Sequence, residues 1–108
     1  MTRYIVIKTQ FEAIHQWKDC PIKEVEYLKY PHRHVFHVTM KWKVLHNDRE
    51  KEFIQMKHTT EKFVRDEFGF NIGEMSCEGI AEKLLNEFDA DFVSVFEDDE
   101  NGAEIYKV

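Results

Sequence analysis

The chain has 108 residues, of which 43% are hydrophobic and 33% are charged, a balance that predicts one folded domain, residues 1–108, around a single core. The 15 basic and 21 acidic residues leave a net charge of −6, which argues against nucleic acid as a partner, and no apolar run is long enough to cross a bilayer. The first ten residues alternate like a strand and do not resemble a signal peptide, so we expect a cytoplasmic protein with reduced cysteines.

The amino-terminal half predicts extended structure. Residues 4–15 alternate and are rich in β-formers, which predicts a first strand. A mixed loop closes at Pro31, and a second strand is predicted from His32 to about Leu45. After the turn residues His-Asn-Asp-Arg, the segment 50–56 predicts a third extended piece that pairs with the second strand.

The carboxy-terminal half changes to a helical period. Residues 58–69 predict a short helix closed by Gly69, and residues 77–88 predict a second helix capped by Ser76. Residues 91–97 and 103–108 predict two final strands joined by an acidic turn. We therefore expect an α+β fold in ββααββ order, with two helices on one face of an antiparallel four-stranded sheet whose open edges favour oligomerisation.

Three histidines lie at the predicted ends of the two long strands. His32 and His34 are two residues apart, so both point to the face that carries the apolar side chains of their strand. His15 has the same parity in the first strand. Three imidazoles suit zinc with an open fourth position; the alternative is a solvated histidine pair. His37 has the opposite parity, and we do not expect it to be a ligand.

These residues resemble a known family. The fragments "FEAIH" at 11–15 and "HRHVFHV" at 32–38 look like the zinc-binding signature of the 6-pyruvoyltetrahydropterin synthase and 6-carboxytetrahydropterin synthase family. The fragments "EFIQMK", "MSCEGIAEKL" and "VSVFEDDENGAEIY" follow in the order that this family has, at positions 52–57, 75–84 and 93–106.

The resemblance implies a T-fold, in which the sheets of several subunits join into a barrel, as a trimer or a hexamer. It implies zinc ligands at His15, His32 and His34. It also implies that Glu97 accepts the amino and ring N–H groups of a pterin and that Glu78 is a second substrate-binding glutamate. The expected substrate is dihydroneopterin triphosphate or a related dihydropterin, as in queuosine and 7-deazaguanine biosynthesis.

The catalytic relay of the family is incomplete here. The expected cysteine lies a few residues before the His-x-His pair, whereas Cys20 lies twelve residues before His32, and the segment 64–75 contains no histidine for the expected Asp-His pair. Cys20 is the candidate catalytic residue, although it could equally be an idle buried thiol. The further candidates are residues that could supply a base, a thiol or an imidazole: Glu24, Glu26, Cys77 and His58.

Three functions are compatible with this sequence. The first is a zinc-dependent lyase or synthase that makes a 6-carboxy- or 6-pyruvoyl-tetrahydropterin. The second is an enzyme that cleaves the dihydropterin side chain by a retro-aldol reaction. The third is a non-catalytic zinc-containing protein that binds a pterin or a purine and has lost the Asp-His relay.

Overall fold

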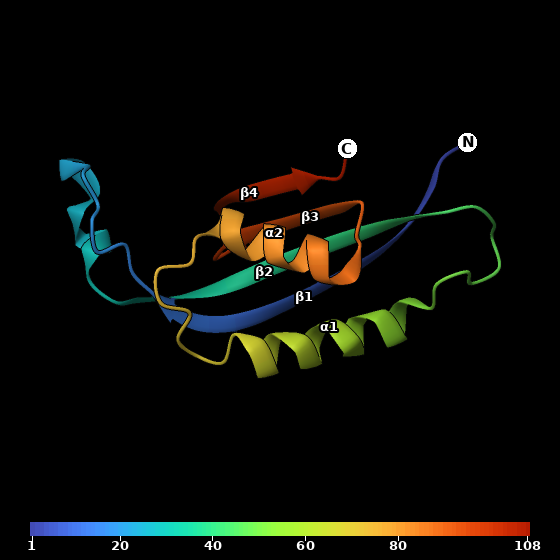
Figure 1. Cartoon of the computed structure of the whole chain (residues 1–108), viewed down its shortest axis with the longest axis horizontal. Helices are drawn as coiled ribbons and strands as arrows, with labels where there is room; N and C mark the ends of the chain where they lie inside the picture. The colour runs from blue at the N-terminus through green and yellow to red at the C-terminus, as the bar shows by residue number, and fades with distance from the viewer.

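The computed structural model describes residues 1–108 and contains four strands, two α-helices and one 3₁₀ helix (Figure 1). No helix in it is long and apolar enough to cross a membrane. In chain order, the elements are β1 Arg3–His15, the 3₁₀ helix η1 Lys23–Lys29, β2 His32–Val44, α1 Phe53–Glu67, α2 Cys77–Phe88, β3 Phe92–Glu97 and β4 Asn101–Tyr106.

The strands form one antiparallel sheet in the order β1-β2-β3-β4. β1 and β2 pair along their whole length, from Arg3 opposite Val44 to His15 opposite His32. The predicted antiparallel four-stranded sheet and the α+β class are therefore confirmed. β1 and β4 each have a sheet neighbour on one side only.

Both helices contribute to one hydrophobic core with a single face of the sheet. Figure 1 shows α1 running along β1 and α2 lying in front of the sheet. The sheet contributes alternate side chains, because side chains two apart in a strand share a face. The largest fully buried side chains are Trp42, Phe36, Met40, Ile80, Leu84, Val38, Val93, Val95 and Thr60.

The prediction of a third extended piece at residues 50–56 is wrong. Phe53 begins α1, and the Glu52 side chain caps that helix by accepting the backbone N–H groups of Ile54 and Gln55. The apolar Phe53 and Ile54, which suggested a strand, are exposed on the helix. The packed face of α1 starts at Met56 instead.

The segment between β1 and β2 was predicted as a loop, but part of it forms the 3₁₀ helix η1. This segment projects from the end of the sheet, at the left of Figure 1, away from both α-helices. None of the residues of η1 is buried, and Tyr27 and Tyr30 are largely exposed. The segment therefore lies outside the core, and its base is the end of the β1–β2 ladder.

Candidate metal centre

The β1–β2 register brings three histidines together. His15 and His32 are direct partners at the last position of the ladder, and His34 lies opposite Ala13 on the same face. The centroid of the His15 ring lies 4.5 Å from that of His32 and 5.4 Å from that of His34. The centroids of the His32 and His34 rings are 5.0 Å apart. One nitrogen from each ring lies within 4.8 Å of the other two.

Each of the three rings is held through its Nδ1 atom. The Nδ1 of His15 lies 2.9 Å from the carbonyl oxygen of Met75, and that of His32 lies 2.8 Å from the carbonyl oxygen of Tyr30. The Nδ1 of His34 lies 2.6 Å from Oδ2 of Asp98. Carbonyl and carboxylate oxygens can only accept, so all three Nδ1 atoms must donate a proton. In the neutral rings, the Nε2 atoms therefore carry the free lone pairs.

The His15 ring shows that the cluster fits a metal ion. Its Nε2 lies 3.1 Å from Oε2 of Glu97, but this contact lacks hydrogen-bond geometry and no other polar atom satisfies this buried nitrogen. A buried polar atom without a partner costs about 1–3 kcal/mol. A metal ion bound to the Nε2 lone pair would remove that cost, and neutral imidazole is a preferred ligand of zinc.

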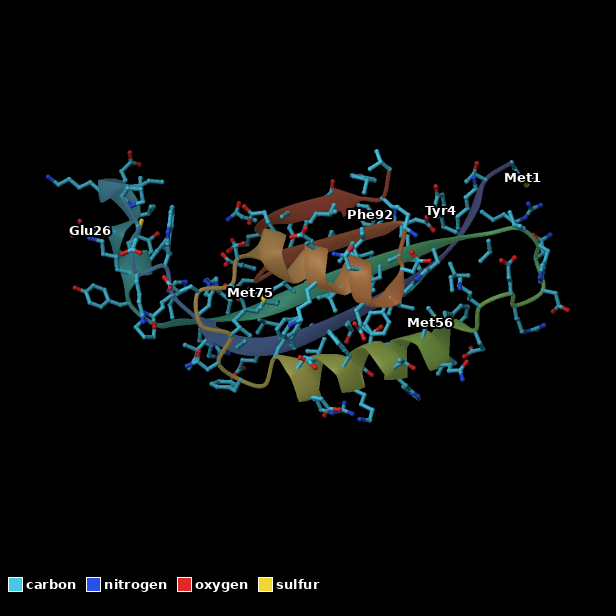
Figure 2. All side chains as sticks on the ribbon, in the orientation of Figure 1. Met1, Tyr4, Glu26, Met56, Met75 and Phe92 are labelled. Carbon is cyan, nitrogen blue, oxygen red and sulfur yellow. The ribbon has the colours of Figure 1, made fainter.

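Met75 reaches His15 because the connection between α1 and α2 runs along the end of β1. The backbone N–H of Ile14 donates to the carbonyl of Phe70, and that of Ile72 donates to the carbonyl of Ile14. Met75 is labelled in Figure 2, where it lies in this connection just before α2. The connection thus supplies the acceptor that orients the most buried of the three histidines.

The carboxylate of Glu97 lies close to the Nε2 atoms of His15 and His34. It is the last residue of β3, and its Oε1 lies 3.7 Å from the Nε2 of His34, while Oε2 faces His15. The Glu97 side chain raises the pKa of His15 above its ordinary value, against the opposing effect of burial. The same contact with His15 lowers the pKa of Glu97. Glu97 therefore favours the protonated form of His15 when no metal is bound, and His15 favours the ionised form of Glu97.

A cavity of about 400 Å³ opens beside the cluster. Its lining includes the predicted ligands His15 and His32 and both predicted substrate-binding residues, Glu97 and Glu78. His34 does not line the cavity, although it completes the histidine cluster. Such a volume lies within the range of small-molecule sites. The structure therefore brings a candidate metal centre and the carboxylates of Glu97, Glu78 and Glu74 to one hollow.

Comparison with known proteins shows the fold alone. No family model and no curated protein matches the sequence. The chain is similar to the crystal structure of an uncharacterized protein from Wolinella succinogenes, with a TM-score of 0.71 and 10% sequence identity. The similarity covers 100% of this chain and 99% of that one. The architecture is therefore shared over the full length.

The candidate catalytic residue Cys20 lies away from the cavity. It is buried in the segment between β1 and β2, where its Sγ lies 3.7 Å from the carbonyl oxygens of both Ile22 and Val25. The other candidate bases of this segment, Glu24 and Glu26, are exposed on η1 and do not line the cavity. The structure therefore gives Cys20 contacts within its own loop and none with the histidines.

The remaining candidates divide between two places. His58 is exposed on α1 and belongs to a different hollow, between α1 and β1. Cys77, at the start of α2, lines the cavity beside the histidines. The sequence singled it out only as a further thiol, because its place in a helix start gave no sign that it faced the site.

Cys77 is expected to be unreactive in the metal-free protein. Burial, aided by the charges of Glu97 and Glu78, raises its pKa to about 12. Since the thiolate is the reactive form, alkylation by iodoacetamide at pH 8 should be about 1,000-fold slower than for an ordinary thiol. Mass spectrometry of the Cys77 peptide after timed alkylation measures this, with the urea-unfolded chain as control. Labelling at equal rates in both states would contradict it.

Asp98 orients one of the clustered histidines, a role that the sequence did not reveal. Besides its contact with His34, it accepts the backbone N–H of Val35 through Oδ1, and its own N–H donates to the carbonyl of Val35. The Val35 N–H, followed by His34, lowers the pKa of Asp98. Asp98 stands next to Asp99 and Glu100 in an acidic turn, so the sequence alone did not distinguish it from its neighbours.

Asp98→Asn is expected to weaken zinc binding about 10–100-fold, because the carboxylate that orients a histidine ligand raises the basicity of that ligand. Asparagine tolerates the positive φ of 52° at this position. Competition with a chromophoric chelator measures the affinity. Asp99→Asn is the matched control, since Asp99 also has a positive φ and forms no ion pair with the three clustered histidines. Equal losses in both variants would show a general charge effect.

Proposed function

We propose that this chain is a zinc-dependent enzyme of the 6-pyruvoyltetrahydropterin synthase and 6-carboxytetrahydropterin synthase type, acting on dihydroneopterin triphosphate or a related dihydropterin. One observation carries the proposal: three imidazoles have one nitrogen each within 4.8 Å of the other two, and all three Nδ1 atoms are bound to acceptors, which leaves the Nε2 lone pairs for a metal ion. Three histidine ligands leave one zinc position for a substrate, which is the arrangement of catalytic zinc sites.

The residues around the cluster support a substrate role for the cavity. Zinc bound there would act as a Lewis acid on a hydroxyl or carbonyl oxygen of the substrate side chain. Glu97 and Glu78 offer two carboxylates to the N–H donors of a pterin ring in the same cavity. Both are already in place at the ends of β3 and the start of α2, so binding would require little reorganisation.

The assembly proposed with this function is a T-fold barrel made by a trimer or a hexamer. The outer edge of β4 and the part of the β1 edge before Ile14 support it, because no other strand pairs there; at Ile14 the β1 edge is bonded to the connection between α1 and α2. An open strand edge is available for pairing with another chain. A molar mass from light scattering of three or six times 13.0 kDa would agree with this assembly.

A second candidate is a zinc-containing protein that binds a pterin or a purine without catalysis. The position of Cys20 favours it, since no thiol other than the protonated Cys77 lines the cavity. Nor does any histidine line it beyond His15 and His32. A retro-aldol reaction needs fewer catalytic groups than the first candidate, because a single base is enough. In this protein that base would have to be a carboxylate of the cavity.

The deciding experiment incubates zinc-loaded protein with dihydroneopterin triphosphate and identifies the products by mass spectrometry. A 6-carboxy- or 6-pyruvoyl-tetrahydropterin would support the first candidate, and a pterin without its side chain would support the retro-aldol reaction. Unchanged substrate that remains bound to a protein with one zinc per chain would favour the binding protein. A His32→Ala variant, prepared in the same way, controls for contaminating activity.

A further inference from the structure

The carboxylate of Glu97 is positioned toward the metal centre as well as toward the cavity. Its two oxygens approach different imidazoles, Oε2 at 3.1 Å from the Nε2 of His15 and Oε1 at 3.7 Å from the Nε2 of His34. These are the same nitrogens whose lone pairs converge. Since Glu97 contacts both, it lies where a fourth ligand would stand.

These distances match the spacing of atoms that share one zinc ion. In a tetrahedral site with bonds of about 2.0–2.1 Å to zinc, neighbouring ligand atoms are about 3.3 Å apart. The two observed nitrogen–oxygen distances lie on either side of that value. A zinc ion among the Nε2 atoms could therefore contact Glu97 after small side-chain rotations.

The backbone fixes Glu97 in this place. Glu97 pairs with Phe36 in the β2–β3 ladder, and the next residue, Asp98, is bonded to Val35 through both its backbone N–H and its side chain. The backbone at Glu97 is thus held by its own pairing in the sheet and by the two hydrogen bonds of the residue that follows it. Because its backbone is fixed, only the side chain of Glu97 has to be ordered when it binds an ion.

No other carboxylate near the cavity occupies this position. Asp98 contacts the Nδ1 of His34, on the opposite edge of the ring from the metal-binding nitrogen. Glu74 accepts the backbone N–H of Lys18. Glu78 lines the cavity but is not among the carboxylates paired with the histidines.

We propose that Glu97 is the fourth ligand of the metal when no small molecule is bound, so that the resting site is closed with three imidazoles and one carboxylate. This inference rests on the metal centre of the proposed function and gives Glu97 a role beyond pterin binding. On that function, the carboxylate must leave the metal to receive the pterin N–H pair. Ligand binding would then open the fourth position.

The test uses cobalt(II) as a spectroscopic probe of the full-length protein, with thiocyanate as a small competing ligand. A closed site should give a wild-type visible spectrum that millimolar thiocyanate leaves unchanged. In Glu97→Gln, the spectrum should shift, thiocyanate should change it further, and zinc affinity should fall by a factor on the order of 100. Glu100→Gln, in the same turn and exposed, should behave like the wild type.

The outcomes separate this inference from the proposed function. If wild type and Glu97→Gln have the same cobalt spectrum and both respond to thiocyanate, Glu97 is not a ligand, while the three-histidine centre stands. If the wild type binds neither cobalt nor zinc, the metal centre itself is wrong. Circular dichroism of the metal-free variants shows that they are folded, and a weaker affinity without a spectral change would reduce Glu97 to a nearby charge and overturn its role as a ligand.

Discussion

His32→Ala is expected to abolish stoichiometric zinc binding. The wild-type protein should retain about one zinc per chain after dialysis, whereas the variant should lose about two to three orders of magnitude in affinity, because one of the few bonds that hold the ion is gone. His32 is only partly buried and its Nδ1 contacts the nearby Tyr30 carbonyl, so its removal should leave the core intact. Inductively coupled plasma mass spectrometry and chelator competition measure the result.

His37→Ala is the matched control for this experiment. His37 lies on the same strand and is also partly buried, but it has the opposite parity and pairs with Gln10 and Phe96 away from the cluster. Its replacement should leave zinc content and affinity unchanged. Equal zinc loss in His37→Ala, or full zinc content in His32→Ala, would contradict the assignment of the ligands.

Trp42→Ala should cost about 3–5 kcal/mol of the free energy of unfolding. Trp42 is 1% exposed, and its Nε1 donates to the carbonyl of Phe88, the last residue of α2. The change removes a large core side chain and leaves a helix-terminal carbonyl without its partner. Urea denaturation followed by circular dichroism measures the difference between the variant and the wild type.

Two variants separate the contributions in this prediction. Trp42→Phe retains most of the packing but loses the N–H donor, so it should cost about 1–3 kcal/mol. Leu45→Ala, one position beyond β2 and 78% exposed, should change stability by less than about 0.5 kcal/mol. A loss in Leu45→Ala as large as that in Trp42→Ala would place the packed core elsewhere.

The long strands could be predicted because their signal is local. The alternation of residues 4–15 and 32–45 reflects a sheet with one covered face, and the structure places β1 and β2 within one residue of the predicted bounds. Parity also placed His15, His32 and His34 on the covered face correctly. Such inferences need only the two-residue repeat of a strand.

The start of α1 could not be predicted from the same local pattern. The neighbouring apolar residues Phe53 and Ile54 suggested a strand, whereas the packed face of the helix includes the buried Thr60, a polar residue. The Thr60 hydroxyl donates to the carbonyl of Met56 one turn earlier. This hydrogen bond allows the Thr60 hydroxyl to be buried in the core. An apolar residue at this position would have completed the helical pattern of the sequence, whereas threonine interrupts it.

The hydrogen-bond acceptors around the candidate metal centre could not be predicted from local patterns either. The acceptors for the three histidines come from Met75, Tyr30 and Asp98, two of which are backbone carbonyls that carry no residue signature. Asp98 lies 64 positions from His34, and only the pairing of β2 with β3 brings them together. By contrast, Cys20 was proposed because it lies in the loop where the resembled family has its cysteine, and a place in a loop says nothing of where the thiol points.

The pairing of His15 with His32 has a consequence for the segment 16–31, whose two ends they mark. A metal ion bound by both residues would cross-link the chain at the base of this projecting segment. Such a link restricts the separation of the two ends in the unfolded ensemble and prevents the end of the ladder from fraying. Metal loss would then first increase hydrogen exchange in the projecting segment, while the amides of β2 and β3 beneath the helices stayed protected.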